Sequence, residues 1–226
     1  MRILALDTST EYCSVALWQD GVIVERCELV GQKHSEVLIT MLDDLLQATG
    51  HKLQAMDGIA FGKGPGSFTG VRIACGVAQG LAFGADVQVV GVCTLEALAQ
   101  ASRRDKVIAA LDARMGEIYH AVYEKRDAAW ATVNEPRLCK PEDAPTVSGA
   151  GWFGAGSGFF AHGEVLDARY AGQLRGVDGN AVPQAAAIAA LGAARLMRGE
   201  GVDAAQALPL YLRDKVALKT SEREAR

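Results

Sequence analysis

Positive charge is scarce in this sequence of 226 residues. It holds 23 Lys and Arg against 27 Asp and Glu, which gives a formal net charge of −4. Proteins that bind nucleic acid unaided usually carry a clustered basic excess. The charge balance therefore argues against direct nucleic-acid binding by the isolated chain.

Paired cysteines, clustered histidines and long apolar runs are also missing. The five cysteines are scattered, with no Cys-x-x-Cys, which argues against a disulfide framework or a cysteine zinc site and favours a reducing compartment. The four histidines form no His-x-x-x-His pair for a metal. No run approaches the roughly 20 apolar residues of a membrane span, and Asp7 comes too early for a signal peptide. We expect a cytoplasmic protein with no membrane segment.

What is present is an alternation of short β-prone and longer helical segments, which predicts an α/β fold. The chain opens as an antiparallel meander with a hairpin turn at Asp20-Gly21. Residues 126–160 are predicted to be irregular, and the polar tail 218–226 to be frayed. The predicted strands are 2–7, 12–18, 22–30, 59–61, 87–92, 107–112 and 117–123, and the predicted helices are 34–48, 70–84, 94–102 and 183–198.

One strand–Asp–turn–strand unit occurs twice, centred on Asp7 and Asp112. Ile3-Leu4-Ala5-Leu6 precedes the first Asp and Ile108-Ala109-Ala110-Leu111 the second, and a polar turn and another strand follow each. The match is short, so chance is the alternative to duplication. Duplication predicts two lobes, 1–103 and 104–226, and leaves open whether the last helix packs back on the first lobe.

Two sets of residues are candidates for phosphate binding. They are the strand-end residues Asp7, Thr8 and Ser9, and Gly66, Ser67 and Thr69 of the glycine-rich loop 62–70. The alternative is that the Asp and hydroxyls only cap backbone N–H groups of the turn, with Thr69 as a helix N-cap. The loop is not a Walker A motif, because Lys63 precedes most of its glycines.

Gly149-Ala150-Gly151-Trp152-Phe153-Gly154 fits the pattern Gly-x-Gly-x-x-Gly. No βαβ unit is evident around it, so a dinucleotide site is not expected.

Two predicted helices have faces that a single core does not explain. The apolar stripe of 34–48 is wider than one core-facing side requires. Gly76 and Gly80 lie on one face of 70–84, and glycine inside a helix costs about 1 kcal/mol relative to alanine. Positions without side chains let another backbone approach, so we expect a partner on these helices.

Several motifs resemble the TsaB (YeaZ) family of tRNA threonylcarbamoyladenosine biosynthesis. The most specific is Gly64-Pro65-Gly66-Ser67-Phe68-Thr69-Gly70-Val71-Arg72. The supporting segments are 3–10, His34-Ser35-Glu36, 94–98, 112–117 and 209–213, which span the chain in the family's order.

The resemblance implies an actin-like ATPase fold of two lobes built from a duplicated mixed-sheet unit. It also implies kinship with the catalytic subunit TsaD, which holds a metal through a histidine pair. Thr94 and Leu98 stand where those histidines would be, and leucine cannot ligate a metal. The resemblance thus implies a non-catalytic subunit without a metal or cofactor of its own, with ATP or ADP at a complex interface left open.

The partners that the resemblance implies are TsaD and TsaE, a homodimer when TsaD is absent, and tRNA only through the complex. The candidate partner-binding residues are His34, Val37, Leu38, Met41, Leu42, Leu45, Arg72, Gly76 and Gly80. Two alternatives remain open, a small actin-like ATPase or kinase and a glycoprotease-type hydrolase.

Overall fold

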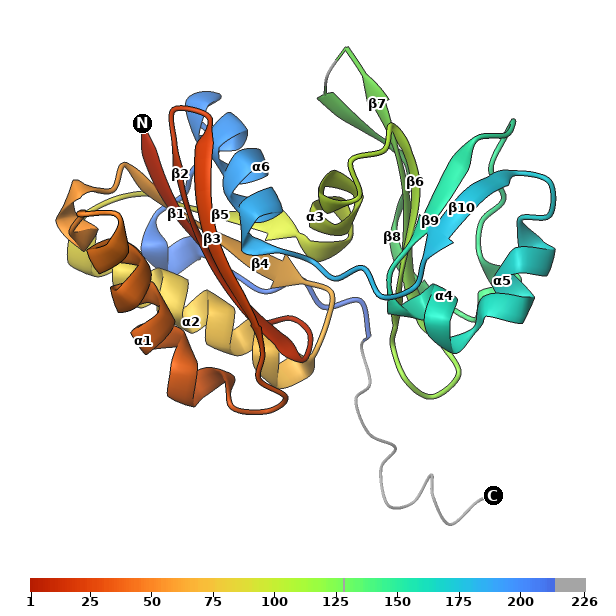
Figure 1. The fold of residues 1–226 in the computed structure, drawn as a ribbon, viewed down its shortest axis with the longest axis horizontal. Helices are drawn as coiled ribbons and strands as arrows, with labels where there is room; N and C mark the ends of the chain where they lie inside the picture. Colours follow the sequence, from red (N-terminus) through yellow and green to blue (C-terminus); the bar gives the residue numbers. More distant parts are fainter. Residues whose placement is uncertain (128, 214–226) are drawn as a thin grey trace.

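Each half of the chain folds into a five-stranded mixed sheet, and the two sheets share one topology (Figure 1). The computed structural model describes residues 1–127 and 129–213. The first sheet has the order β3-β2-β1-β4-β5 and the second β8-β7-β6-β9-β10. In each sheet the first three strands pair antiparallel, and the last two run parallel to the first. The predicted α/β fold of two duplicated lobes is therefore confirmed.

The first sheet consists of β1 (Arg2–Asp7), β2 (Tyr12–Gln19), β3 (Val22–Leu29), β4 (Gly58–Gly64) and β5 (Val89–Cys93). The second consists of β6 (Lys106–Asp112), β7 (Ile118–Arg126), β8 (Ala129–Cys139), β9 (Trp152–Ala155) and β10 (Leu174–Asp178). Asp20 and Gly21 join β2 to β3 with φ values of 48° and 91°. Positive φ at both central residues is what a tight right-twisted hairpin requires, so the predicted turn is confirmed.

Helices cover both faces of each sheet, and two of them lie between the sheets (Figure 1). The outer face of the first sheet packs on α1 (His34–Ala48) and α2 (Phe68–Ala85), and that of the second on α4 (Ser157–Ala161) and α5 (Gly163–Arg169). Between the sheets lie α3 (Thr94–Ala101) and α6 (Ala185–Met197), which contact each other. Three short 3-10 turns, Leu53–Ala55, Pro141–Asp143 and Ala204–Gln206, complete the fold.

The two inner helices are exchanged between the lobes. α3 follows the first sheet in the sequence but packs on β6 and β7, whereas α6 follows the second sheet and packs on β1, β2 and β4. The apolar cluster on the inner face of the first sheet joins Ile3 and Ala60 to Ile188 and Ala193 of α6. Each sheet thus has one face covered by a helix from the other half of the sequence.

The first sheet also caps the start of α6. Ser14 Oγ of β2 accepts a hydrogen bond from the N–H of Ala185 at 2.9 Å, and Glu25 Oε1 of β3 accepts one from Ala186 at 2.7 Å. The first N–H groups of a helix have no partner inside it, and here a distant part of the chain satisfies two of them. The helix begins at Ala185 rather than at the predicted Pro183.

The prediction that residues 126–160 are irregular was wrong. They contain β8, β9 and the start of α4. β8 is an edge strand with a largely exposed surface and Pro136 within it, so it lacks the apolar alternation of a half-buried strand. The prediction about 218–226 lies outside the described residues.

The argument against a dinucleotide site at Gly149–Gly154 also needs correction. β9, α4, α5 and the parallel β10 do form a βαβ arrangement. However, Gly149 and Gly151 precede β9 instead of following it, whereas the dinucleotide glycines belong in the turn after the strand.

The limits of α2 differ from the prediction at both ends. Its N-cap is Ser67, whose Oγ accepts from Gly70 N–H at 3.3 Å, and not Thr69. It ends at Ala85, where Asp86 takes the left-handed conformation with φ 55°. Among the described residues α2 alone is long and apolar enough to cross a membrane, by length and composition only; a third of it, 33%, is buried, and it packs on β4.

Two helix-interior glycines offer a direct test of the packing. A methyl group at Gly192 of α6 would stand 2.5 Å from Ala60 Cβ, whereas one at Gly80 of α2 would meet nothing within 4 Å. Both Gly→Ala changes gain about 1 kcal/mol of helix propensity. We expect Gly80→Ala to raise the free energy of unfolding by that amount and Gly192→Ala to lower it by about 1–3 kcal/mol through overpacking. Urea unfolding monitored by circular dichroism measures both, and a stabilised Gly192→Ala protein would contradict the α6 docking.

Candidate functional site

The turn after β1 is closed by its own side chains. Asp7 is 1% exposed, and its Oδ1 accepts from the N–H of Ser9 at 3.1 Å and from the Ser9 hydroxyl at 2.8 Å. The Thr8 hydroxyl donates to the carbonyl oxygen of Gly70 at 2.7 Å. An Asp that bonds the backbone two residues ahead is the capping arrangement of an Asx turn.

The glycine-rich loop between β4 and α2 packs directly on this turn. A methyl group at Gly66 would stand 2.5 Å from the carbonyl oxygen of Ser9, and one at Gly70 would overlap that of Thr8. Ser67 N–H donates to Ser9 O at 2.8 Å. The glycines thus allow two backbone segments to touch, and the turn itself occupies the space in front of them.

This geometry corrects part of the predicted phosphate site. Asp7, Thr8 and Ser9 are buried, and both hydroxyls donate to protein oxygens. As placed, they cannot contact a phosphate, and turn capping accounts for them. Of the loop residues, Gly66 is half-buried and Ser67 and Thr69 are exposed, so their part in anion binding stays a prediction.

The Asp7 carboxyl has an unusual environment. Burial raises its pKa from 3.8 to about 7, although the hydrogen bonds from Ser9 lower it in part. Its Oδ2 has no hydrogen-bond partner among the described residues, and it lies so close to Gly62 that a methyl group there would overlap it. Desolvation disfavours the charged form of a carboxyl, so near neutral pH Asp7 holds a proton in a large fraction of molecules.

The second copy of the unit repeats the turn in a more open setting. Asp112 Oδ1 accepts from Arg114 N–H at 2.9 Å, which is the same two-residue spacing as in the first lobe. Its side chain is 17% exposed and also pairs with Arg114 Nη1 at 3.1 Å. Ser157 Oγ accepts from Asp112 N–H at 3.0 Å, and His162 Nε2 lies 3.8 Å from Asp112 Oδ1.

A Ser, a His and an Asp therefore meet at the second lobe, which the sequence did not predict. No sequence signal could have found them, because Ser157 and His162 reach Asp112 only when β9 pairs with β6. A hydrolase needs the nucleophile in hydrogen-bond reach of its base. Within the described ranges, His162 Nε2 has no hydrogen bond, so this nitrogen does not bond the Ser157 hydroxyl.

Thr94 and Leu98, which by the resemblance replace a histidine pair, are both used for packing. The Thr94 hydroxyl is buried and donates to the carbonyl oxygen of Pro65 at 2.5 Å. Leu98 is fully buried on the inner face of the second sheet. In the part of the chain that the structure describes, no three His, Cys, Asp or Glu side chains gather in a metal-binding arrangement.

The predicted partner face divides into buried and exposed residues. Leu38, Met41, Leu42 and Leu45 are at most 5% exposed and pack against the first sheet, and buried His34 lies with Nε2 3.2 Å from the carbonyl oxygen of Tyr12. The expectation that these five contact a partner is corrected, because the chain's own core already covers them. A charge at Leu42 would test folding and not binding.

The remaining predicted residues are available at the surface. Gly76 and Gly80 are exposed, with open space where a side chain would stand. Arg72 is exposed, and its guanidinium carbon lies 3.3 Å from the ring centre of Phe68 and 4.8 Å from that of Tyr211. Val37 packs partly against the core. Sequence reasoning missed Ile39 and Phe83, which are 55% and 85% exposed on the same two helices.

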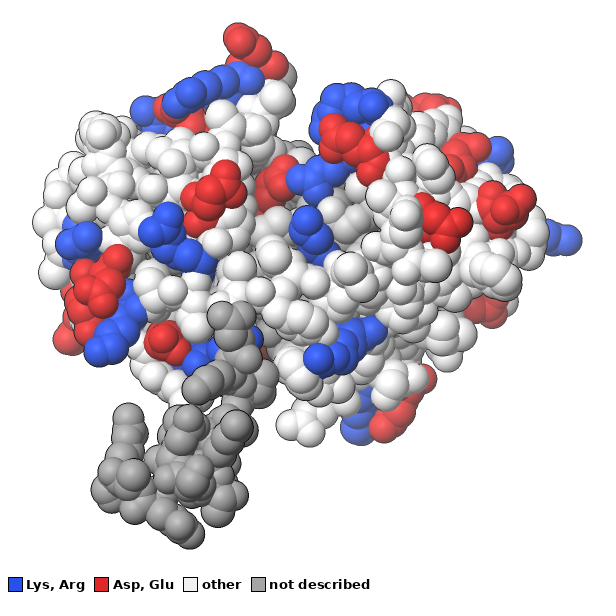
Figure 2. Space-filling model, turned by 180° about the vertical axis from the view of Figure 1, so that it is seen from behind, with Lys and Arg blue, Asp and Glu red and all other residues white. Residues whose placement is uncertain are grey.

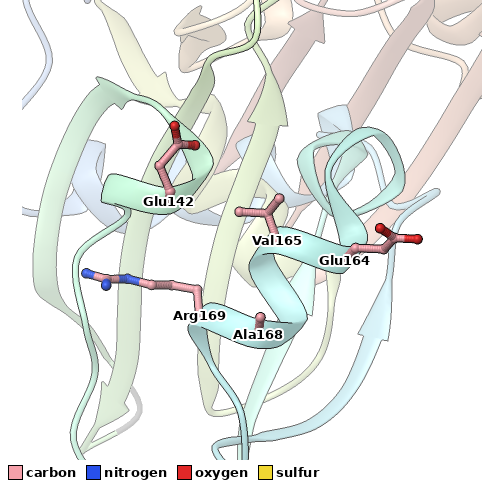
Figure 3. A pocket seen from close by; sticks show the side chains of 5 residues that line it. All are labelled: Glu142, Glu164, Val165, Ala168 and Arg169. Carbon is pink, nitrogen blue, oxygen red and sulfur yellow. The ribbon is translucent and has the colours of Figure 1, made fainter.

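A shallow hollow in the second lobe contains none of the predicted site residues (Figure 3). It measures about 430 Å³ and lies between α5 and the turn at Pro141–Asp143. Glu164 and Arg169 point away from each other, and Arg169 Nε already donates to the carbonyl oxygen of Ala144 at 2.7 Å. We find no chemistry in this arrangement. It is lined by Glu142, Glu164, Val165, Ala168 and Arg169.

The raised pKa of Asp7 predicts how stability depends on pH. Between about pH 4 and 7 the unfolded chain loses a proton that the folded protein keeps, so stability falls as pH rises, by roughly 4 kcal/mol over the whole interval. Asp7→Asn removes this fall and should be clearly more stable than the unchanged protein at pH 8 and about equal at pH 4. Asp43→Asn, at an exposed carboxylate, is the control. Parallel pH profiles of unfolding for Asp7→Asn and the unchanged protein would contradict the prediction.

Comparisons with known proteins, by sequence and by structure, match most of the chain. The family model described as TsaD, tRNA N6-adenosine threonylcarbamoyltransferase, matches residues 21–157. The tRNA threonylcarbamoyladenosine biosynthesis protein TsaB of Escherichia coli is 39% identical over 97% of both chains. That of Haemophilus influenzae is 37% identical over 97% of this chain and 96% of its own.

Solved structures agree with the sequence matches. YeaZ from Pseudomonas aeruginosa is 41% identical, with a TM-score of 0.87 over 93% of this chain and 99% of that one. A Pseudomonas aeruginosa protein described as similar to peptidase YEAZ is also 41% identical, with a TM-score of 0.88 over 94% and 99%. The resemblance read from the motifs is confirmed: the chain belongs to the TsaB (YeaZ) family of tRNA threonylcarbamoyladenosine biosynthesis.

Proposed function

We propose that the chain is a non-catalytic subunit that binds TsaD through the exposed face of α2 and the neighbouring part of α1. In this role it supports transfer of a threonylcarbamoyl group from threonylcarbamoyl-adenylate to the adenosine next to the anticodon of ANN-decoding tRNAs. The observation that carries the proposal is the surface of α2, where apolar and glycine positions lie together without cover. We call Gly76, Gly80, Phe83 and Gly84 the α2 face.

The α2 face lowers the stability of the isolated chain. Its three glycines have nothing within 4 Å of where a side chain would stand, so packing inside the lobe does not require them. Each lowers helix stability by about 1 kcal/mol relative to alanine, and Phe83 is 85% exposed. A second helix lying close along this face would bury the phenyl ring and use the missing side chains.

Two features support the non-catalytic part of the proposal: the burial of the turn after β1 and the burial of Thr94 and Leu98. Asp7, Thr8 and Ser9 are buried in a turn that the glycine-rich loop closes. Thr94 and Leu98, which by the resemblance replace the histidines of TsaD, are buried. The ATPase and kinase alternative would need the turn and loop to separate, and the hydrolase alternative would need His162 to reach Ser157.

The remaining parts of the proposal follow from the same role. TsaE joins the assembly of this chain with TsaD, and tRNA is contacted through the complex, in keeping with the net charge of −4. When TsaD is absent, the α2 face pairs two copies of this chain. Nucleotide, if it binds, does so at the interface of the complex. The protein works in the cytoplasm.

Two Phe→Glu variants test the binding face. Phe83→Glu places a charge on the α2 face, and we expect it to weaken binding to TsaD at least a hundredfold, because the carboxylate would be desolvated in the interface. Phe160→Glu changes a phenylalanine that is 77% exposed in the second lobe, and we expect unchanged affinity. Isothermal titration calorimetry with purified TsaD measures both.

Thermal unfolding of the two variants by circular dichroism should give similar midpoints, since both side chains are exposed. A tRNA modification assay with TsaD and TsaE present should then lose product with Phe83→Glu and keep it with Phe160→Glu. TsaD binding that is equal for Phe83→Glu, Gly80→Arg and the unchanged chain would overturn the proposed face.

A further inference from the structure

We propose that a polar hollow at the free edge of β5 binds a small organic anion, a carboxylate or phosphate group on an apolar body. This goes beyond the proposed function. The hollow measures about 420 Å³, which is within the usual range for small-molecule sites. Figure 2 shows the molecule from behind the view of Figure 1, and on this side Lys and Arg side chains lie beside Asp and Glu side chains along the middle of the molecule. The residues that line the hollow are Phe61, Lys63, Val89, Val90, Gly91, Arg195, Glu200, Val202, Gln206, Ala207 and Leu208.

Because Gly91 has no side chain, Lys63 and Phe61 can lie close to the backbone of β5 at the hollow. A methyl group there would stand 3.0 Å from Lys63 Cδ and 3.3 Å from the Phe61 ring. The aliphatic part of Lys63 therefore lies across the strand edge next to Gly91. Lys63 is one of the residues that line the hollow, and its backbone is fixed by the hydrogen bond from Leu210 N–H to Lys63 O at 2.6 Å.

Among the charged side chains that line the hollow, Lys63 has no ion-pair partner in the described residues. Arg195 pairs with Glu96 at 2.5 Å, and Glu200 pairs with Arg198 at 2.6 Å. Lys63 makes no ion pair with any residue in 1–127 or 129–213. A surplus positive charge inside a concave wall of low dielectric attracts an anion.

The backbone adds a donor at the same place. The N–H of Val89 donates to the carbonyl oxygen of Val202, and the N–H of Val202 donates to the carbonyl oxygen of Val89, at 2.9 Å each. Both backbone groups of Val89 therefore point outward, away from β4. Alternate residues of a strand turn the same way, so Gly91 also faces outward, and its carbonyl accepts from Arg195 Nη1 at 2.9 Å. The N–H of Gly91 is then directed outward at the edge of the hollow that Lys63 also lines, and an N–H and an ammonium group together suit the oxygens of one carboxylate or phosphate group.

The rest of the hollow favours an apolar body over a bare ion. Phe61 and Val90 lie behind the hollow and are buried, at 1% and 4% exposed, whereas Leu208 at its rim is 71% exposed. A ligand with a ring or short hydrocarbon chain would cover Leu208 while its anionic group met Lys63 and Gly91. Inorganic phosphate alone would leave Leu208 uncovered.

Amide NMR spectra of the full chain, titrated with benzoate, phenyl phosphate and inorganic phosphate, test the site. We expect a saturable shift of the Gly91 amide with at least one aromatic anion, and weaker binding of inorganic phosphate. The arms with benzoate and phenyl phosphate separate the carboxylate source from the phosphate source. Benzylamine, which has the same body and the opposite charge, should not shift this amide.

Lys63→Met keeps the aliphatic stem and removes the charge. We expect it to weaken binding of the preferred anion at least fivefold, while Lys52→Met, at an exposed lysine outside the hollow, leaves it unchanged. Absence of a saturable Gly91 shift with every anion, equal binding of benzylamine, or unchanged affinity in Lys63→Met would each overturn the proposal.

Discussion

The docking of α6 on the first sheet is the constraint on which the two-lobed structure depends. The helix comes from the end of the described sequence, yet its Ile188 fills the inner face of the sheet whose strands lie between Arg2 and Cys93. Ser14 and Glu25 hold its first N–H groups, and Gly192 lets it approach Ala60. Since α3 crosses in the opposite direction, neither sheet has both faces covered until the whole chain has folded.

A second constraint, the contact between the β1 turn and the glycine-rich loop, decides what the duplicated unit can do. In the first lobe the turn is so tightly enclosed that Asp7 is buried and its pKa is raised. In the second lobe the corresponding Asp112 is open enough to pair with Arg114. The same local sequence therefore yields a closed structural joint in one lobe and a partly exposed charged cluster in the other.

Much of the fold was predictable because its signals are local. The helix 34–48 was predicted at the bounds where α1 lies, and the duplicated strand–Asp–turn identified the paired sheets. The errors fall where local signals are weak. β8 is an exposed edge strand and β9 has only four residues, so neither shows a strand period. The wide apolar stripe of α1 was harder to interpret for another reason. Leu38, Leu42 and Leu45 all reach the chain's own core, and periodicity does not distinguish residues buried in that core from residues that contact a partner.

The sequence by itself determined the α/β class, the duplication and the family, because these depend on residue order and on a motif as specific as residues 64–72. The tertiary structure alone decided which candidate residues are available for binding. Burial depends on what packs from elsewhere: residues 66–70 enclose Thr8 and Ser9, and the sheet covers Leu42. The edge of β5 is shaped by Arg195 and residues 200–208, which lie a hundred residues later in the chain. Such contacts are set by the path of the whole chain, and no local pattern contains them.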